Sequence, residues 1–234
     1  MAKELIHEIL PVGMLQCNCQ IIGDPETHEA IVIDPGDEVG RILEILKKYN
    51  LKVLALVNTH AHIDHVGGLQ KLRAATGAPV MMHQEDLELY RNIDTQASWL
   101  GVRPPELTQV DSFLAEGDKV RWGSYEVNVL HTPGHTKGSI SLFLPFELLN
   151  SGAPVAHSKK KLPDPARSPI LFAGDTLFAG SIGRTDLWGG SMPQILHSIH
   201  HKLLTLPEDT VVYPGHGPAT TIGDEREMNP FLTR

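Results

Sequence analysis

Cysteine, long apolar runs and positive charge are all scarce in this sequence. Its only two cysteines, Cys17 and Cys19, lie too close together for an ordinary disulfide and provide no disulfide framework. No apolar run reaches the roughly 18 residues that a membrane-spanning helix needs. The opening segment MAKELIHEILPVG has one lysine, two glutamates and no sustained apolar stretch, so a secretory signal is not expected. We therefore expect a soluble, cytoplasmic protein that does not enter a membrane.

The formal net charge is -8, and the sequence contains no large basic block. Such a charge argues against binding to nucleic acid phosphates, so a small-molecule substrate is expected instead. The 234 residues are 41% apolar and 21% charged, which is an ordinary globular composition with enough residues for one substantial core. We expect a single domain over residues 1–234, and the sequence does not indicate an oligomeric state.

Short apolar runs that end in Gly, Pro, Asp or His recur along the chain and predict strands. The expected strands occupy residues 30–36, 53–62, 78–83, 125–135, 139–145, 169–175 and 210–217. Apolar residues at helical spacing predict helices over 38–50 and 191–204, the second with Ser191 and Gln194 at capping-box spacing. The proline-rich segment 145–169 has no steady period and predicts a loop insertion. This mixture of strands and helices indicates an α/β protein.

The densest polar feature is the stretch THAHIDH, which contains His60, His62, Asp64 and His65. It follows an apolar strand and precedes a segment of helical composition. In an extended segment His60 and His62 point the same way, whereas Asp64 and His65, beyond the turn, can face a neighbouring point. Burying these groups together without a cation would be costly. The stretch therefore predicts ligands for two adjacent metal ions.

Further ligands are expected at other strand ends of the same polarity. His135 in HTPGHTKGS, Asp175 in ILFAGDTLF and His216 in VVYPGHGP each follow an expected strand. Each lies beside Gly or Pro, which allow the backbone to turn sharply. With a bridging Asp175, the seven side chains offer four protein ligands to each of two divalent ions. Such nitrogen and oxygen donors suit zinc, which is the first expectation, with iron and manganese as alternatives.

Other polar residues receive supporting or structural roles. Asp34, at the end of the strand over 30–36, is expected either to steady a metal-binding histidine or loop, or only to form an Asp-Pro-Gly turn. His131 is expected to support the site or to lie in the core, and Cys17 and Cys19 are expected to be core residues on one strand face. Structural roles are expected for His7, His28, His83 and His157, and positions on the solvent side of a helix for His197, His200 and His201.

The ordered motifs THAHIDH, TPGHTKGS, FAGDTLF and PGHG resemble the motif series of the metallo-β-lactamase-fold superfamily over roughly residues 5–232. Within it, GDTLFAGSIGRTDLWGG and NPFL resemble most the short, glyoxalase-II-like bacterial hydrolases. The resemblance implies a four-layer αββα sandwich with a dinuclear site at one edge. It also implies one ion held by His60, His62 and His135, a second held by Asp64, His65 and His216, and Asp175 between them.

That resemblance implies hydrolysis of a thioester or ester of the hydroxyacylglutathione type. The expected nucleophile is a hydroxide that bridges the two ions, with Asp64 orienting it as well as acting as a ligand. Arg184 is a candidate for binding an anionic part of the substrate, or for pairing with Asp186. Glyoxalase II itself has a C-terminal helical extension that helps to hold glutathione, whereas this sequence ends at residue 234, soon after His216. Lactoylglutathione in particular is therefore not implied.

An oxidoreductase is the main alternative. Persulfide dioxygenases resemble the sequence in the same motifs, including a G-R-T-D segment, and use one iron held by two histidines and an aspartate. The matching residues here are His60, His135 and Asp175, and open positions on such a site activate oxygen rather than water. A nuclease is disfavoured by the acidic charge, and a non-catalytic binding module by the complete set of ligand positions.

Overall fold

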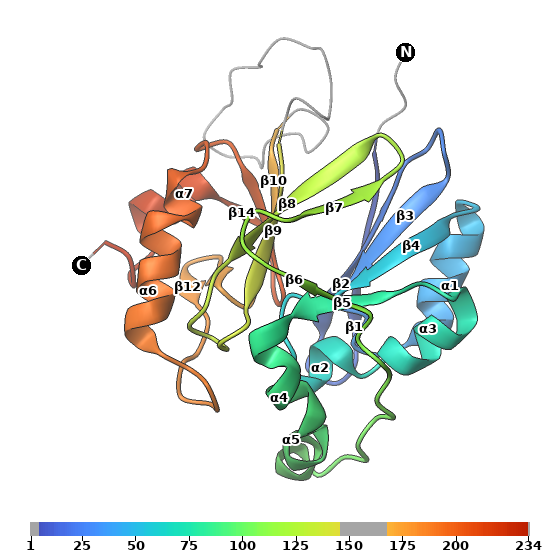
Figure 1. Ribbon diagram of the computed structural model, residues 1–234. Helices are drawn as coiled ribbons and strands as arrows, with labels where there is room; N and C mark the ends of the chain where they lie inside the picture. The colour runs from blue at the N-terminus through green and yellow to red at the C-terminus, as the bar shows by residue number, and fades with distance from the viewer. Residues whose placement is uncertain (1–4, 146–167, 234) are drawn as a thin grey trace.

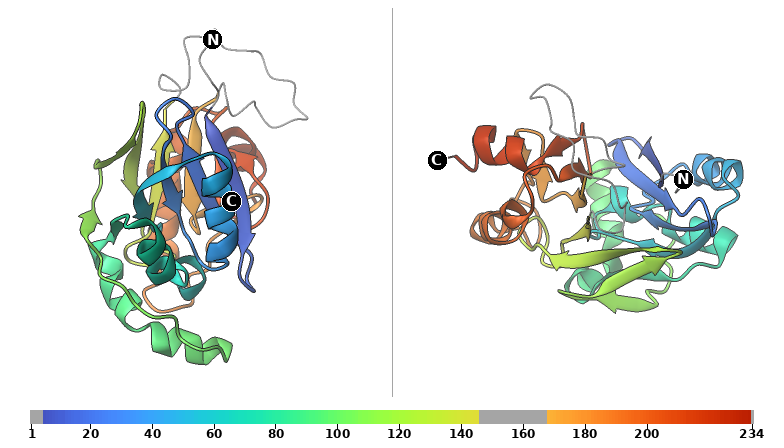
Figure 2. Two further views of the ribbon diagram at one scale, coloured as in Figure 1. Left: turned by 90° about the vertical axis from the view of Figure 1, so that its right-hand side faces the viewer. Right: turned by 90° about the horizontal axis from the view of Figure 1, so that it is seen from above.

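The computed structural model describes residues 5–145 and 168–233 (Figure 1). The loop predicted at 145–169 falls almost entirely on residues 146–167, which lie outside the described residues. Two six-stranded sheets lie face to face at the centre of the molecule, and helices cover their outer faces (Figure 2). Within the described residues no helix is both long enough and apolar enough to cross a membrane.

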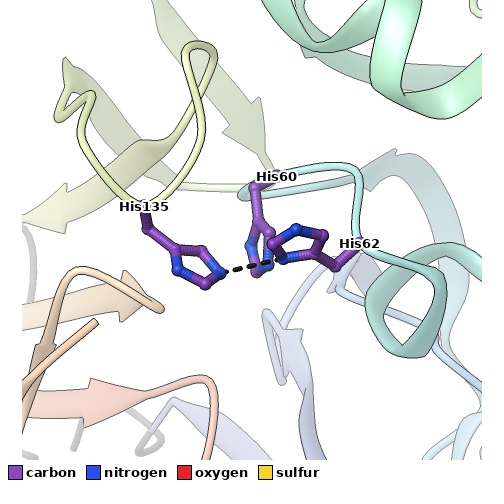
Figure 3. A group of neighbouring side chains, drawn as sticks. All are labelled: His60, His62 and His135. Carbon is purple, nitrogen blue, oxygen red and sulfur yellow. Dashed lines mark hydrogen bonds between the residues drawn. The ribbon is translucent and has the colours of Figure 1, made fainter. Parts of the chain in front are cut away.

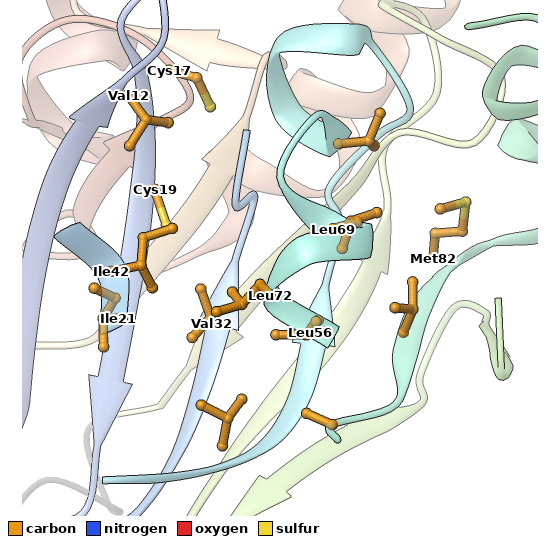
Figure 4. Packing of buried hydrophobic residues seen from close by; sticks show 14 of the residues in the cluster. Val12, Cys17, Cys19, Ile21, Val32, Ile42, Leu56, Leu69, Leu72 and Met82 are labelled. Carbon is orange, nitrogen blue, oxygen red and sulfur yellow. The ribbon is translucent and has the colours of Figure 1, made fainter. Parts of the chain in front are cut away.

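The first sheet contains six strands in chain order. They are β1 (Ile6–Val12), β2 (Cys17–Gly23), β3 (Glu29–Ile33), β4 (Lys52–Val57), β5 (Val80–His83) and β6 (Ser112–Leu114). The helices of this half are α1 (Val39–Lys48), α2 (Ile63–Val66), α3 (Leu69–Thr76), η1 (Gln84–Asp86), α4 (Leu87–Arg91) and α5 (Ile93–Leu100). Ile42 of α1 and Leu69 and Leu72 of α3 pack on Ile21 and Leu56 of the sheet and form a first core (Figure 4).

The second sheet has the order β14, β13, β10, β9, β8, β7. Its strands are β7 (Lys119–Trp122), β8 (Tyr125–His131), β9 (Ile140–Leu144), β10 (Ile170–Gly174), β13 (Val211–Pro214) and β14 (Thr220–Thr221), and a small hairpin pairs β11 (Leu177–Phe178) with β12 (Ser181–Ile182). The accompanying helices are α6 (Met192–His201), η3 (Leu203–Thr205) and α7 (Ile222–Met228). Ile195 and Ile199 of α6 and Ile222 of α7 pack on Leu171 and Val212 to form a second core.

A third core fills the space between the sheets. Ile31 and Val57 of the first sheet meet Val127, Leu142 and Phe172 of the second, and all five side chains are buried. Burial of each such side chain contributes roughly 1.5–3 kcal/mol relative to exposure. Helices, sheet, sheet and helices thus follow one another, and the αββα sandwich expected from the sequence is confirmed.

Strand direction determines where the functional side chains gather. Strands β3, β4 and β5 are parallel neighbours in the first sheet, and β10 and β13 are parallel neighbours in the second. Because parallel strands end at the same edge of a sheet, the loops that follow them lie close together. The stretch from His60 to His65 follows β4, Asp175 follows β10 and His216 follows β13, so all of them lie at this edge.

All seven predicted strands are present, and the helices expected over 38–50 and 191–204 correspond to α1 and to α6 with η3. The predicted capping box at Ser191 is wrong, because no side-chain hydrogen bond caps α6. The N–H of Ser191 instead donates to the carbonyl oxygen of Gly134 at 2.7 Å. This N–H is therefore not available to the side chain of Gln194. His197, His200 and His201 are exposed on α6, as predicted.

Candidate metal centre

The structure brings together all seven side chains that the sequence analysis assigned to a metal site. Among these seven, three groups have ligand atoms that lie within 4.8 Å of one another. The groups are His60, His62 and His135; Asp64, His65 and His216; and His60, His65 and Asp175. They come from loops after four different strands and from the short helix α2, so only the folded chain assembles them.

The first group is formed by three imidazoles from two loops (Figure 3). His62 Nδ1 and His135 Nε2 lie 2.9 Å apart, and the His60 ring centroid lies 4.9 Å from that of His62 and 4.7 Å from that of His135. His60 Nε2 is buried and has no hydrogen-bond partner among the described residues. Since buried polar atoms are almost always paired, this unpaired nitrogen indicates a position for a bound cation.

The second group contains one carboxylate and two imidazoles. His216 Nε2 lies 3.1 Å from Asp64 Oδ2 and 3.3 Å from His65 Nε2. Asp175 lies between the two groups, because its Oδ1 is 3.5 Å from His65 Nε2 and its Oδ2 is 3.5 Å from His135 Nε2. Oδ1 of Asp175 is also buried without a hydrogen bond within the described part of the chain. The residues present therefore fit a pair of cations that share this carboxylate.

The outer nitrogens of four histidines are oriented by oxygen atoms. His60 Nδ1 lies 3.1 Å from Thr59 Oγ1, and His65 Nδ1 lies 3.0 Å from Asp34 Oδ2. His135 Nδ1 lies 2.8 Å from the Arg184 carbonyl oxygen, and His216 Nδ1 lies 3.0 Å from the Leu15 carbonyl oxygen. An acceptor at Nδ1 favours the tautomer that carries its proton there, which leaves the Nε2 lone pair facing the centre. Metal-binding histidines in proteins are commonly oriented in this way.

Asp34 joins several parts of this arrangement. Its Oδ1 accepts from the Thr59 N–H at 2.8 Å, and its Oδ2 accepts from the Thr59 hydroxyl at 2.7 Å, in addition to facing His65. The backbone of Asp34 has a φ of 51°, a left-handed conformation that aspartate adopts more readily than most residues. Asp34 is thus more than a turn residue, because it connects the end of β3 to the stretch that carries His60 and His65.

A glycine beside Asp175 permits the close approach of the second sheet. A Cβ atom at Gly215 would lie 2.1 Å from Asp175 Oδ1 and 2.8 Å from His65 Cε1. No side chain can therefore replace the glycine that precedes His216 without displacing Asp175 or His65.

The surroundings of His60, His62 and Asp64 favour the protonation states that bind cations, whereas those of His65 favour its protonated form. Burial, reinforced by His135, lowers the pKa of His62 to about 3, and burial with neighbouring imidazoles lowers the pKa of His60. Burial opposes the ionisation of Asp64, but His65 and His216 outweigh it and lower the pKa of that carboxyl. Burial also opposes the protonation of His65, yet the acidic side chains around it raise its pKa. A bound cation would take the place of that proton.

Asp86, which no sequence motif indicated, connects the two histidine-bearing loops. The buried Asp86 accepts from the Ala61 N–H at 2.9 Å and the Thr136 hydroxyl at 2.8 Å through Oδ2, and from the Gly138 N–H at 2.6 Å through Oδ1. Gln96 of α5 also holds the first of these loops, since it donates to the Ala61 carbonyl at 3.1 Å. Asp86 could have been found from its position, because it follows β5 as Asp34 follows β3.

Three other residues differ in part from their expected roles. Arg184 forms an exposed two-point ion pair with Asp186, both contacts at 2.8 Å, which is one of its two expected arrangements. Cys17 is buried as predicted, but its sulfur also lies 3.5 Å from His65 Nδ1. His131 is not a core residue, because 23% of its side chain is exposed; its Nε2 donates to the Lys137 carbonyl in the loop of His135.

Several known proteins are similar to this chain. The family model of the metallo-beta-lactamase superfamily matches residues 12–147 and 166–216. The hydroxyacylglutathione hydrolase GloC of Haemophilus influenzae is 35% identical over 232 residues, which cover 96% of this chain and 97% of that protein. The mitochondrial persulfide dioxygenase ETHE1 of Mus musculus is 30% identical over 218 residues, which cover 91% of this chain and 70% of that protein.

Two solved structures share the fold over nearly the whole chain. The B3 metallo-beta-lactamase BLEG-1 has a TM-score of 0.82 and 35% sequence identity, with 98% of this chain and 100% of that chain covered. The di-iron-bound form of TTHA1623 has a TM-score of 0.78 and 36% identity, with 96% of this chain and 100% of that chain covered.

Proposed function

This chain belongs to the metallo-β-lactamase superfamily, and from that premise we propose that it is a hydrolase of thioesters or esters with two divalent metal ions. The observation that carries the proposal is the position of Asp175 between two complete groups of side chains. His60, His62 and His135 would hold one ion, and Asp64, His65 and His216 the other. Zinc is the proposed metal, with iron and manganese as alternatives.

When bound, such a pair of ions activates water near neutral pH and polarises the carbonyl oxygen of the substrate. The protein residues then have separate tasks. Asp64 and Asp175 offset the positive charge, and Asp64 is placed to orient the attacking water by accepting a hydrogen bond from it. No protein nucleophile is needed, and burial raises the pKa of the nearby Cys17 thiol to about 12, which leaves it unreactive.

The substrate reaches the centre from the side of Asp64 and His216. Their side chains are 16% and 28% exposed, whereas those of His65 and His135 are 0% and 3% exposed. A scissile carbonyl therefore lies against Asp64 and His216, with the buried imidazoles behind them. The similarity to GloC supports a hydroxyacylglutathione-type thioester as the first substrate to test.

Persulfide oxidation is the second candidate, because the chain is 30% identical to a persulfide dioxygenase. That reaction would need His60, His135 and Asp175 around a single iron. The second group, Asp64, His65 and His216, is assembled just as closely, and this completeness favours two ions and hydrolysis.

One set of assays on the purified protein separates the two functions. We expect two divalent ions per chain by elemental analysis, release of thiol from hydroxyacylglutathione thioesters, and no oxygen uptake with glutathione persulfide. If the protein instead contains one iron per chain, consumes oxygen and does not hydrolyse thioesters, the hydrolase proposal fails and the dioxygenase activity is supported. Asp64→Asn, which keeps the size of the side chain, should abolish thiol release.

A further inference from the structure

A groove leads away from the candidate metal centre. Its volume is about 340 Å³, and Asp64 forms part of its lining together with Ile63 of the same helix. One wall is the tip of the β1–β2 hairpin, and the other is the end of α5 at Leu100 with the residues that follow it as far as Pro105. This volume lies within the range of roughly 300–1,000 Å³ that small-molecule sites occupy.

The groove and the centre share a structural element. Leu15 lines the groove, and its carbonyl oxygen accepts the hydrogen bond from His216 Nδ1 at 3.0 Å. The same residue thus orients a side chain of the centre and forms a wall beside it. A molecule in the groove would consequently be held next to Asp64 and His216, on the side from which the centre is accessible.

Much of the groove surface is apolar although it faces solvent. The exposed fractions are 64% for Met14, 45% for Leu15, 38% for Leu100 and 40% for Val102. These side chains come from both walls. Apolar side chains gathered around a groove and rimmed by charge are typical of a surface that binds a ligand.

The groove also contains two cations that have no anion of their own. Lys71 of α3 and Arg103 line it, and neither forms an ion pair or a side-chain hydrogen bond within residues 5–145 and 168–233. Other cations of the same surface are paired, as Arg73 is with Asp111 at 2.8 Å. Asp37 and Asp64 also line the groove, but neither pairs with these two cations. Asp37 Oδ1 accepts from the Glu38 N–H at 2.7 Å, and Asp64 Oδ2 lies 3.1 Å from His216 Nε2. Lys71 and Arg103 are therefore free to pair with an anionic group of a ligand.

We propose that this groove binds an apolar arm of the substrate that ends in a carboxylate, with Lys71 and Arg103 as the residues that select the carboxylate. The proposal rests on the proposed function, because it places the scissile thioester at Asp64. Either the acyl half or the thiol half of the substrate can supply such an arm. The chain then prefers anionic thioesters over neutral thioesters of the same length.

Binding can be measured without turnover. The probe is a thioether that joins N-acetylcysteamine to a six-carbon chain ending in a carboxylate, and its partner has a chain of equal length ending in a methyl group. By calorimetry with the metal-loaded protein we expect the carboxylate compound to bind roughly five- to tenfold more tightly, as two exposed ion pairs of about 0.5–0.7 kcal/mol each imply. Raised salt should reduce the difference.

Two double variants determine whether the groove is responsible. Lys71→Gln with Arg103→Gln should remove the preference for the carboxylate compound. The control, Lys52→Gln with Arg91→Gln, removes the same charge from exposed positions outside the groove lining. This control variant should still prefer the carboxylate compound. The inference would be overturned if the unmodified protein bound the two compounds equally. It would also be overturned if the Lys71→Gln, Arg103→Gln variant still preferred the carboxylate compound.

Turnover of matched thioesters then shows whether the acyl half or the thiol half of the substrate lies in the groove. The adipoyl thioester of N-acetylcysteamine carries the carboxylate on the acyl side, and the acetyl thioester of 6-mercaptohexanoate carries it on the thiol side. Each thioester is compared with a neutral thioester of the same length. If a carboxylate arm occupies the groove, its thioester should have the higher kcat/KM in the unmodified protein and lose this advantage in the Lys71→Gln, Arg103→Gln variant. If the carboxylate preference in binding holds but neither thioester is hydrolysed, the proposed function fails and the groove assignment stands.

Discussion

Asp34 Oδ2 lies 3.0 Å from Nδ1 of His65 although 31 positions separate the two residues in the sequence. Both side chains are buried, so a carboxylate from the end of β3 determines which nitrogen of His65 faces the centre. The ligand set thus depends on residues that would never touch a metal ion themselves.

Asp34→Asn should weaken metal binding by about 10- to 100-fold, as loss of such supporting contacts does at other metal centres. An amide cannot accept both the Thr59 and His65 hydrogen bonds in the way a carboxylate does. The measurement is metal content after dialysis against a graded series of chelator concentrations. Asp94→Asn, an exposed change on α5, is the control. Equal retention of metal by the two variants would exclude this role for Asp34.

Asp86→Ala should destabilise the metal-free protein by about 2–4 kcal/mol. It leaves the N–H groups of Ala61 and Gly138 and the Thr136 hydroxyl without their buried acceptor, and hydrogen bonds to a charged group contribute about 1.5–3 kcal/mol each before relaxation. Urea unfolding measures the change. Glu88→Ala, at an exposed neighbouring position, should change the free energy of unfolding by less than about 0.5 kcal/mol. A similar effect of both substitutions would contradict the connection of the two loops through Asp86.

Two glycines four positions apart should respond in opposite ways to alanine. At Gly36 a Cβ atom would lie 1.6 Å from the Asp64 carbonyl oxygen, whereas at Gly40 it would meet nothing within 4 Å. We expect Gly36→Ala to displace α2, lower the free energy of unfolding by several kcal/mol and impair metal binding. Gly40→Ala, inside α1, should stabilise the protein by up to about 1 kcal/mol. Thermal unfolding of the two variants gives the comparison, and a tolerated Gly36→Ala would show that α2 does not pack as described.

His7 should make the protein less stable in mild acid. Its ring packs edge-on against Phe172 and Tyr213, at centroid distances of 5.5 and 4.6 Å, and burial lowers its pKa. Below the unfolded pKa of about 6.5 the unfolded chain binds this proton while the folded chain does not. The free energy of unfolding therefore falls as the pH falls, by at most about 1.4 kcal/mol per pH unit from this group, until the folded pKa is reached.

His7→Phe should remove that part of the pH dependence. The lost hydrogen bond to Gln20 changes stability equally at every pH, so the difference between the two slopes isolates the histidine. Denaturant unfolding of the metal-free proteins between pH 7 and 5 provides both slopes. Parallel curves would mean that His7 is protonated as readily in the folded chain as in the unfolded one.

The seven side chains of the candidate centre could be brought together from the sequence because a simple rule applies to them. Four of them, His60, His135, Asp175 and His216, each follow a short apolar strand beside a turn, and strands of one direction end at one edge of a sheet. The neighbouring His62, Asp64 and His65 then needed only the turn into α2. The αββα architecture came from the resemblance of the motifs to a known family rather than from periodicity.

Features that depend on contacts between distant segments were not predictable in this way. The Leu15 carbonyl that orients His216 belongs to a hairpin that was not predicted, since β1 contains Pro11, a residue rarely found inside strands, and every residue of β2 is buried without alternation. The capping box at Ser191 failed for the same reason, because its N–H is bonded to Gly134, 57 positions earlier in the sequence. Local patterns do not contain these partners.

Anomalous X-ray diffraction from crystals grown with zinc tests most directly whether the seven side chains hold two ions. With data collected on both sides of the zinc absorption edge, we expect two peaks about 3.5–4 Å apart. One should lie against His60, His62 and His135, the other against Asp64, His65 and His216, and Asp175 should contact both. A pocket without a peak, or zinc bound only at other histidines of the chain, would contradict the proposed centre.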